Sequence, residues 1–263
     1  MASDNPFENA EAVLFDLDDT LMRSTYADTL AIHCSIDALR QHQNIEKDDE
    51  DLRGMIRYIK KGLNRPSPDS YLFNELLEKL GIGDLSLATR MGIVYRDVVV
   101  ATMRLYADAI PFLREMYSIG VRTGLVSNGE EFIQREKIIR SEILDYFNTI
   151  HVSGMKDDSM KKPYTMIFDR ALEALEVSPD EAIYIGDRLD TDILGANKAG
   201  LFSIRILRED GRYNDETEEN VFKNANWEQE YPNIEIKSKD ELKPKMEINS
   251  LKELMPYFAS IEN

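Results

Sequence analysis

Residues 12–21 read AVLFDLDDTL, a run of apolar residues that passes directly into Asp16, Asp18 and Asp19. Five short apolar runs of this kind, rich in β-branched residues, lie at 12–17, 121–126, 149–152, 182–185 and 202–207. Their length and composition are typical of buried strands. Helical periodicity marks the segments between the later runs, at 109–119, 130–144, 164–175 and 191–199. Strands that alternate with helices predict an α/β fold with a Rossmann-like parallel sheet.

About a hundred residues separate the first two predicted strands, and their pattern is helical throughout. Because a single crossover helix is far shorter, we expect an inserted α-helical cap domain at 22–107 and an α/β core at 1–21 and 108–263. Within the core, 208–245 is expected to be an insertion or an edge segment. The tail also contains a short repeat, IEIKSKDELKP at 234–244 and MEINSLKELMP at 246–256. The second copy has the better apolar pattern, so we expect it to dock on the core while the first adds an edge segment.

Composition excludes several classes of protein. The 263 residues include 49 acidic and 32 basic side chains, for a formal charge of −17, which disfavours binding to nucleic acid or to an anionic membrane. The longest apolar runs are far too short to span a bilayer. The first twelve residues lack Lys, Arg and an apolar stretch, so no secretion signal is expected, and a single cysteine cannot form an internal disulfide. We therefore expect a cytoplasmic monomer or homodimer with no nucleic-acid or membrane partner.

Polar side chains stand at the carboxyl ends of three predicted strands. Asp16 and Asp18 follow the first, Ser127 and Asn128 the second, and Asp187 the fourth. In an open parallel sheet these ends meet at one crevice, where ligands bind. Any one of these motifs could equally be a helix cap or a turn. Together they indicate one site, and carboxylates without His or Cys suit a hard cation such as Mg²⁺.

On these residues the chain resembles the haloacid dehalogenase superfamily of phosphohydrolases, in the branch with a helical cap inserted after the first motif. The resemblance covers 12–207 and includes all four family motifs in order. They are DxDxT at Asp16, Asp18 and Thr20, a Ser after an apolar strand at Ser127, a Lys before Pro at Lys162, and GDxxxxD at Asp187 and Asp192.

The resemblance implies a Mg²⁺-dependent phosphomonoesterase that forms an aspartyl-phosphate. Asp16 would be the nucleophile, and Asp18 would protonate the leaving alkoxide and later deprotonate the attacking water. Mg²⁺ would be held by the carboxylates of Asp16 and Asp187 and by the main-chain carbonyl of Asp18.

The remaining motif residues would bind the phosphate or orient the groups that do. Ser127 and the main-chain N–H groups of Asn128 and Gly129 would hydrogen-bond the phosphoryl oxygens, and Lys162 would supply a fixed positive charge. Lys162 is preferred to Lys161 because it directly precedes Pro163, and Pro is favoured at a first helical position. Asp192 would orient Lys162 or a metal-bound water, and Thr20 would fix its loop by hydrogen bonding.

Two alternatives stay open at this point. A phosphomutase uses the same four motifs and returns the phosphate to an intermediate. A catalytically silent binding protein would be signalled by loss of one of these residues, and none is lost. A haloalkanoate dehalogenase is disfavoured because its pattern lacks the second Asp, Asp18. The substrate expected is a small phosphorylated metabolite of unknown identity.

Overall fold

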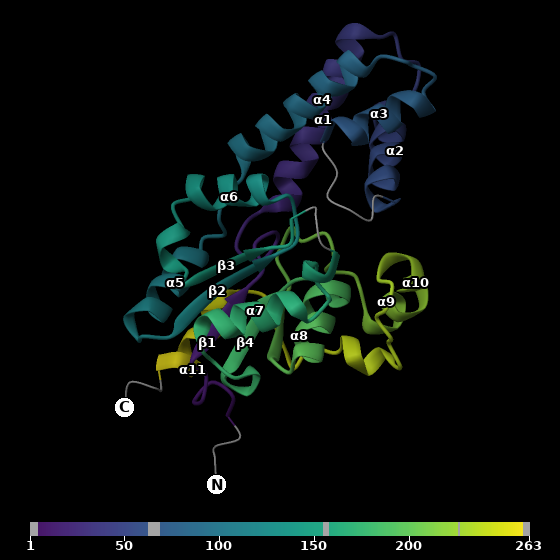
Figure 1. Ribbon diagram of the computed structural model, residues 1–263. Helices are drawn as coiled ribbons and strands as arrows, with labels where there is room; N and C mark the ends of the chain where they lie inside the picture. Colours follow the sequence, from purple (N-terminus) through teal and green to yellow (C-terminus); the bar gives the residue numbers. More distant parts are fainter. Residues whose placement is uncertain (1–4, 63–68, 155–157, 226, 260–263) are drawn as a thin grey trace. The chain divides into compact units, whose positions relative to one another are not determined.

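The computed structural model describes residues 5–62, 69–154, 158–225 and 227–259. They divide into two compact units, 1–23 with 104–263 and 24–103. The first unit is built on a parallel sheet and the second is helical (Figure 1).

The described strands of the first unit form one six-stranded sheet in the order β3-β2-β1-β4-β5-β6. Their bounds are β1 (Ala12–Phe15), β2 (Arg122–Ser127), β3 (Thr149–Val152), β4 (Ala182–Gly186), β5 (Phe202–Ile206) and β6 (Met246–Ile248). All neighbouring strands pair in parallel. The predicted α/β fold with a Rossmann-like parallel sheet is therefore confirmed. The strand order reverses at β1, which is where such sheets bind ligands.

Helices cover both faces of this sheet. On one face, α7 (Met166–Leu175) and α8 (Leu194–Ala199) pack over a cluster of buried residues that includes Leu14, Phe168 and Tyr184 (Figure 1). The other face carries α5 (Ala109–Ser118) and α11 (Met255–Ala259), together with α6 (Glu131–Arg140). There the rings of Phe15 and Phe258 each make an edge contact with Phe112, with centroids 6.0 and 5.9 Å apart. Each face thus buries the apolar side chains that alternate along the strands.

Two elements differ from the sequence-based expectation in ways that affect the site. The helix expected at 191–199 is preceded by a π-helical turn, Leu189–Ile193, and α8 begins only at Leu194. The helix expected from Tyr164 begins at Met166, so Pro163 lies in the preceding turn and not at the first helical position. The Lys162–Pro163 peptide is cis.

The tail repeat folds as two similar units with different neighbours. In each copy a Ser and a Glu three residues later form a capping box around a short 3₁₀ helix, at 239–242 and 251–253. The second copy supplies the edge strand β6, whereas no strand occurs among the described residues of the first. The first copy instead buries Leu242 against the π-helical turn, together with residues of α9 (Glu218–Asn224) and α10 (Trp227–Glu230). The segment that forms the edge of the sheet is thus the second copy and not the first.

The described residues of the second unit form four helices, α1 (Ser24–His42), α2 (Asp49–Gly62), α3 (Asp69–Lys79) and α4 (Leu85–Thr102). Their apolar faces form a separate core that includes Ile36, Phe73 and Met91. Asp84 caps the N-terminus of α4 by accepting a hydrogen bond from the Leu87 N–H at 2.9 Å.

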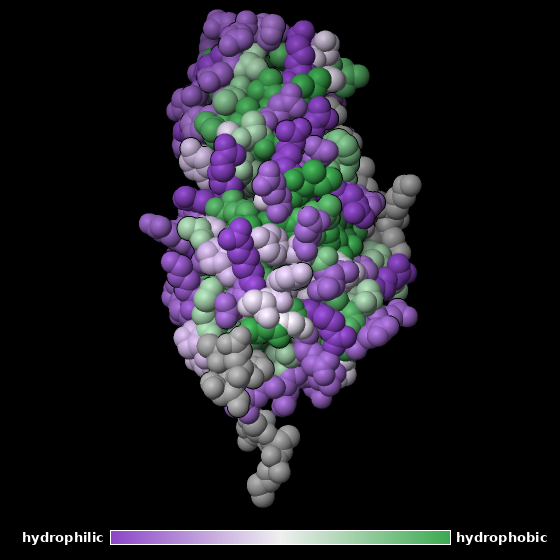
Figure 2. All heavy atoms as spheres, turned by 90° about the vertical axis from the view of Figure 1, so that its left-hand side faces the viewer, coloured by the Kyte–Doolittle hydropathy of each residue, from purple (hydrophilic) through white to green (hydrophobic). Residues whose placement is uncertain are grey.

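None of the described helices combines the length and the apolar composition needed to cross a membrane. On the face shown in Figure 2, hydrophilic and hydrophobic residues are interspersed.

Candidate active site

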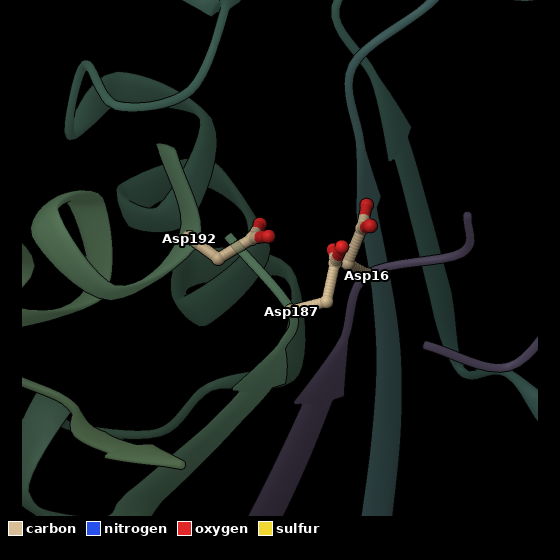
Figure 3. A group of neighbouring side chains, drawn as sticks. All are labelled: Asp16, Asp187 and Asp192. Atoms are coloured by element: carbon tan, nitrogen blue, oxygen red, sulfur yellow. The ribbon is translucent and has the colours of Figure 1, made fainter. Parts of the chain in front are cut away.

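Three buried carboxylates converge at the carboxyl end of the sheet (Figure 3). Asp16 follows β1, Asp187 follows β4, and Asp192 comes from the π-helical turn. One oxygen of each lies within 4.8 Å of the others. The register explains the first two positions, because Phe15, the last residue of β1, pairs with Ile185 and β4 ends only one residue later. Carboxylates this close repel one another unless cations or donors compensate their charge.

Lys162 supplies one such positive charge. Its side chain is 2% exposed, and its Nζ donates to Asp16 Oδ1 and Asp192 Oδ1, both at 2.6 Å, and to the Tyr184 hydroxyl at 2.9 Å. Burial acts to lower the pKa of Lys162, but the charges and hydrogen bonds of Asp16 and Asp192 outweigh it and raise the pKa above its ordinary value. The ammonium is therefore charged at neutral pH.

The charges of Asp16 and Asp187 remain only partly compensated. Burial raises the pKa of Asp16 to about 7, with Lys162 opposing the rise and Asp192 and Asp18 adding to it. Burial also raises the pKa of Asp187 well above its ordinary value, and the neighbouring Asp192 and Asp16 add to this shift. Among the described residues, no hydrogen bond or ion pair ends on the carboxylate of Asp187. This arrangement favours a cation at the two carboxylates.

The donors around Asp192 occupy both of its oxygens. Oδ1 accepts from Lys162 and, at 2.8 Å, from the Tyr184 hydroxyl, and Oδ2 accepts from the main-chain N–H of Arg188 at 3.1 Å. Tyr184 lies in β4, is buried with its ring against Phe168, and was not singled out from the sequence. A tyrosine in an apolar strand has no sequence signature that separates this position from an ordinary core position.

The side chain of Asn128 is committed to the backbone of Lys162. Its side-chain Nδ2 donates to the Lys162 main-chain oxygen at 3.0 Å, and its Oδ1 accepts from the Lys162 N–H at 2.7 Å. Both ends of the amide are thus used to fix the backbone of Lys162. The main-chain N–H of Asn128, which is the group expected to contact a phosphate, is not involved in these two hydrogen bonds.

Ser127 and Asp18 share a partner on α6. Gln134 Nε2 lies 2.7 Å from Ser127 Oγ and 2.9 Å from Asp18 Oδ2. Lys137 Nζ contacts both Asp18 oxygens, at 2.8 and 3.0 Å. Neither Gln134 nor Lys137 belongs to the four motifs, and sequence reasoning missed both. Their spacing of three on the helix that follows Ser127 is the one signal available.

The loop after β1 is fixed by another unexpected residue. The Thr20 hydroxyl is buried and has no hydrogen-bond partner among the described residues, so it does not fix the loop as expected. The buried Arg208 instead donates from Nε and Nη2 to the Thr20 main-chain oxygen, at 3.0 and 2.6 Å. Asp19, at the turn of this loop, adopts a positive φ of 53°.

The site has buried carboxylates and a lysine at the switch point of a parallel α/β sheet, which is where enzymes of this fold class bind their ligands. Comparison with known proteins identifies the family. Residues 10–200 match the family model of the haloacid dehalogenase-like hydrolases. The chain belongs to this family, and the predicted resemblance is confirmed.

Two relatives agree with this assignment, and a solved structure shares the fold. The chain is 36% identical to the glyceraldehyde 3-phosphate phosphatase of Methanopyrus kandleri over 78% of this chain and 86% of that protein. It is 31% identical to the enzyme of the same name from Methanocaldococcus jannaschii, over 78% of this chain and 87% of that protein. Among solved structures, the magnesium-bound HAD-hydrolase YfnB of Bacillus subtilis matches 95% of this chain and 99% of its own, with a TM-score of 0.68 and 22% identity. That structure shares the fold.

Proposed function

We propose that this protein is a Mg²⁺-dependent phosphomonoesterase that cleaves a small phosphorylated metabolite through an aspartyl-phosphate on Asp16. The observation that carries the proposal is the placement of Asp16 between Lys162 and Asp187, at the end of the central strand. The relatives named as phosphatases, which align with most of the chain, support the same reaction class.

The donor set fits Mg²⁺. Asp192 is occupied by hydrogen-bond donors, so the carboxylates of Asp16 and Asp187 would hold the ion, with the main-chain carbonyl of Asp18 as a third ligand. All of these ligands are oxygens, which Mg²⁺ prefers. A bound Mg²⁺ would offset the negative charge that the phosphate and the two carboxylates bring together.

The protein residues divide the reaction into two steps. In the first, a carboxylate oxygen of Asp16 attacks phosphorus and the ester P–O bond breaks, while Asp18 gives a proton to the leaving oxygen. In the second, Asp18 takes a proton from water, and the water oxygen displaces Asp16 to release inorganic phosphate. The Lys162 ammonium offsets the charge of the phosphoryl group in both steps, and Ser127 would donate a hydrogen bond to it.

We propose glyceraldehyde 3-phosphate as the first substrate to test. Relatives that are 30–36% identical over at least 74% of this chain bear that name. Relatives that match less of the chain or have lower identity are named phosphoserine phosphatase, ribulose-1,5-bisphosphate 5-phosphatase and N-acylneuraminate-9-phosphatase. Their substrates complete a test panel of four small phosphate esters.

The test is phosphate release from this panel and from 4-nitrophenyl phosphate, with Mg²⁺ or with EDTA. We expect release that requires Mg²⁺ and falls by at least about 10³-fold in Asp16→Asn, because the nucleophile is lost. Asp145→Asn is the matched control. Asp145 is exposed and belongs to none of the four motifs, so this variant should retain wild-type activity. Activity that survives in Asp16→Asn would contradict the proposal, and isomerisation of a substrate without phosphate release would indicate a mutase instead.

The assignment of 22–107 as a cap, the cytoplasmic location and the oligomeric state stay predictions.

A further inference from the structure

Helix α6 buries two polar side chains, Gln134 and Lys137, which are 1% and 8% exposed. Apolar residues suffice to bury one face of a surface helix, and burying a lysine ammonium is costly unless an opposite charge and hydrogen bonds compensate it. Here the compensation comes from Asp18, whose two oxygens lie 2.8 and 3.0 Å from Lys137 Nζ. The cost of burying this lysine is therefore offset by a contact with the residue proposed to transfer the proton.

Gln134 connects Asp18 with the phosphate side of the site. Its Nε2 lies 2.9 Å from Asp18 Oδ2, 2.7 Å from Ser127 Oγ and 3.3 Å from the Asn128 main-chain oxygen. Gly129 packs directly against it, since a Cβ at Gly129 would lie 2.9 Å from Gln134 Cγ. The Gln134 side chain is thus confined to the position in which it bridges Asp18 and Ser127.

Given the proposed function, we propose that Gln134 and Lys137 are positioning residues that hold Asp18 for proton delivery to the leaving group. When the ester P–O bond breaks, its electron pair stays on the alcohol oxygen, which takes the proton of Asp18. Asp18 is left as a carboxylate beside the Lys137 ammonium. Gln134 also holds Ser127, so it affects the phosphate contact as well as the proton transfer.

The test compares two leaving groups. 4-Nitrophenolate departs without a proton, whereas an alkoxide requires one. The alkyl ester is the member of the substrate panel that the wild type hydrolyses fastest. We measure kcat/KM, because it reports the steps up to the first irreversible one, which here is release of the alcohol. The ratio of the two values in one preparation does not depend on how much of a variant is folded.

For Lys137→Met we expect kcat/KM to fall by about 10- to 100-fold with the alkyl ester and by less than about threefold with 4-nitrophenyl phosphate. Lys137→Arg keeps the charge and should recover most of the loss. Asp18→Asn gives the full size of the leaving-group effect for comparison.

For Gln134→Met we expect KM to rise with both esters, because Ser127 loses its partner, and an additional loss of kcat/KM with the alkyl ester alone. Arg135→Met is the matched control on the same helix. Arg135 is exposed and pairs with Glu131 at 3.0 Å, so both esters should react at wild-type rates.

Equal losses on the two esters in Lys137→Met, without recovery in Lys137→Arg, would overturn this inference and leave the proposed function intact. A wild-type protein that releases phosphate from neither ester would refute the proposed function and this inference with it.

Discussion

Gly186, the last residue of β4, lies directly against the side chain of Asp192. A Cβ at this position would lie 2.5 Å from both Cβ and Cγ of Asp192. Since carbon atoms in contact are ordinarily about 3.5 Å apart, Gly186→Ala requires a displacement of about 1 Å. Asp192 cannot move this far and keep its contact of 2.6 Å with Lys162. The substitution therefore shifts the lysine that contacts Asp16.

Two losses are expected from Gly186→Ala. Overpacking should lower the free energy of unfolding by about 1–3 kcal/mol. Misplacing a charged group of the site by about 1 Å should lower kcat/KM by about 100-fold, which corresponds to about 2.7 kcal/mol of transition-state stabilisation. The measurements are urea denaturation and phosphate release from the best substrate, at a temperature at which the variant stays folded.

Gly124→Ala is the matched control. Gly124 lies in β2 of the same sheet, and a Cβ there would lie 2.5 Å from Leu14 Cδ2, the same distance but against an apolar side chain. We expect a comparable loss of stability and activity within about threefold of the wild type. Wild-type activity in Gly186→Ala, or an equal loss of activity in Gly124→Ala, would show that the contact between Gly186 and Asp192 does not position Lys162.

Three further predictions concern charge and burial. Because the pKa of Asp16 is about 7 in the metal-free protein, its ionisation destabilises the fold as the pH rises from 4 to 7. Mg²⁺ should therefore raise Tm more at pH 8 than at pH 5, and an equal rise at both would contradict this. The pKa of Asp108 is lowered despite its burial, mainly by hydrogen bonds from Arg208, Ser250 and the Leu251 N–H. The stabilising effect of the Asp108 carboxylate is therefore present above pH 4 and is lost as the pH falls through the lowered pKa. In urea denaturation, Asp108→Asn should cost about 3 kcal/mol at pH 7 and clearly less near pH 3, whereas a cost independent of pH would exclude the ion pair as its cause. Tyr184→Phe removes the hydroxyl that donates to Asp192 and should lower the free energy of unfolding by about 1–2 kcal/mol, and an unchanged midpoint in urea would show that this hydrogen bond contributes nothing.

Local sequence patterns predicted most of the fold and most of the residues of the site. Five of the six strands of the sheet, all except β6, lie within two residues at each end of a predicted run, because short β-branched runs bounded by polar residues are local features. Asp16, Ser127 and Asp187 were expected to meet because parallel strands end at one edge, and Asp16 and Asp187 indeed belong to one buried cluster. The family, the enzyme class and the reaction class followed from the same four motifs.

Other features depend on contacts between distant residues. Gln134 and Lys137 contact Asp18 across 116 and 119 positions, and Arg208 contacts Thr20 across 188. A lysine on a helix has the same local pattern whether it lies in solvent or is buried beside a carboxylate. Likewise, the two tail copies have similar sequences, yet only the second pairs with β5.

Local sequence patterns suffice to predict the order of strands and helices, the carboxylates and lysine of the four motifs, and the family. The donors that hold each of those groups are known only from the folded protein: Lys162 and Tyr184 on Asp192, α6 on Asp18, and Arg208 on the loop after β1. The physical reason is that periodicity and strand ends follow from neighbouring residues. The partner of a buried charge is fixed only when elements far apart in the chain pack against each other.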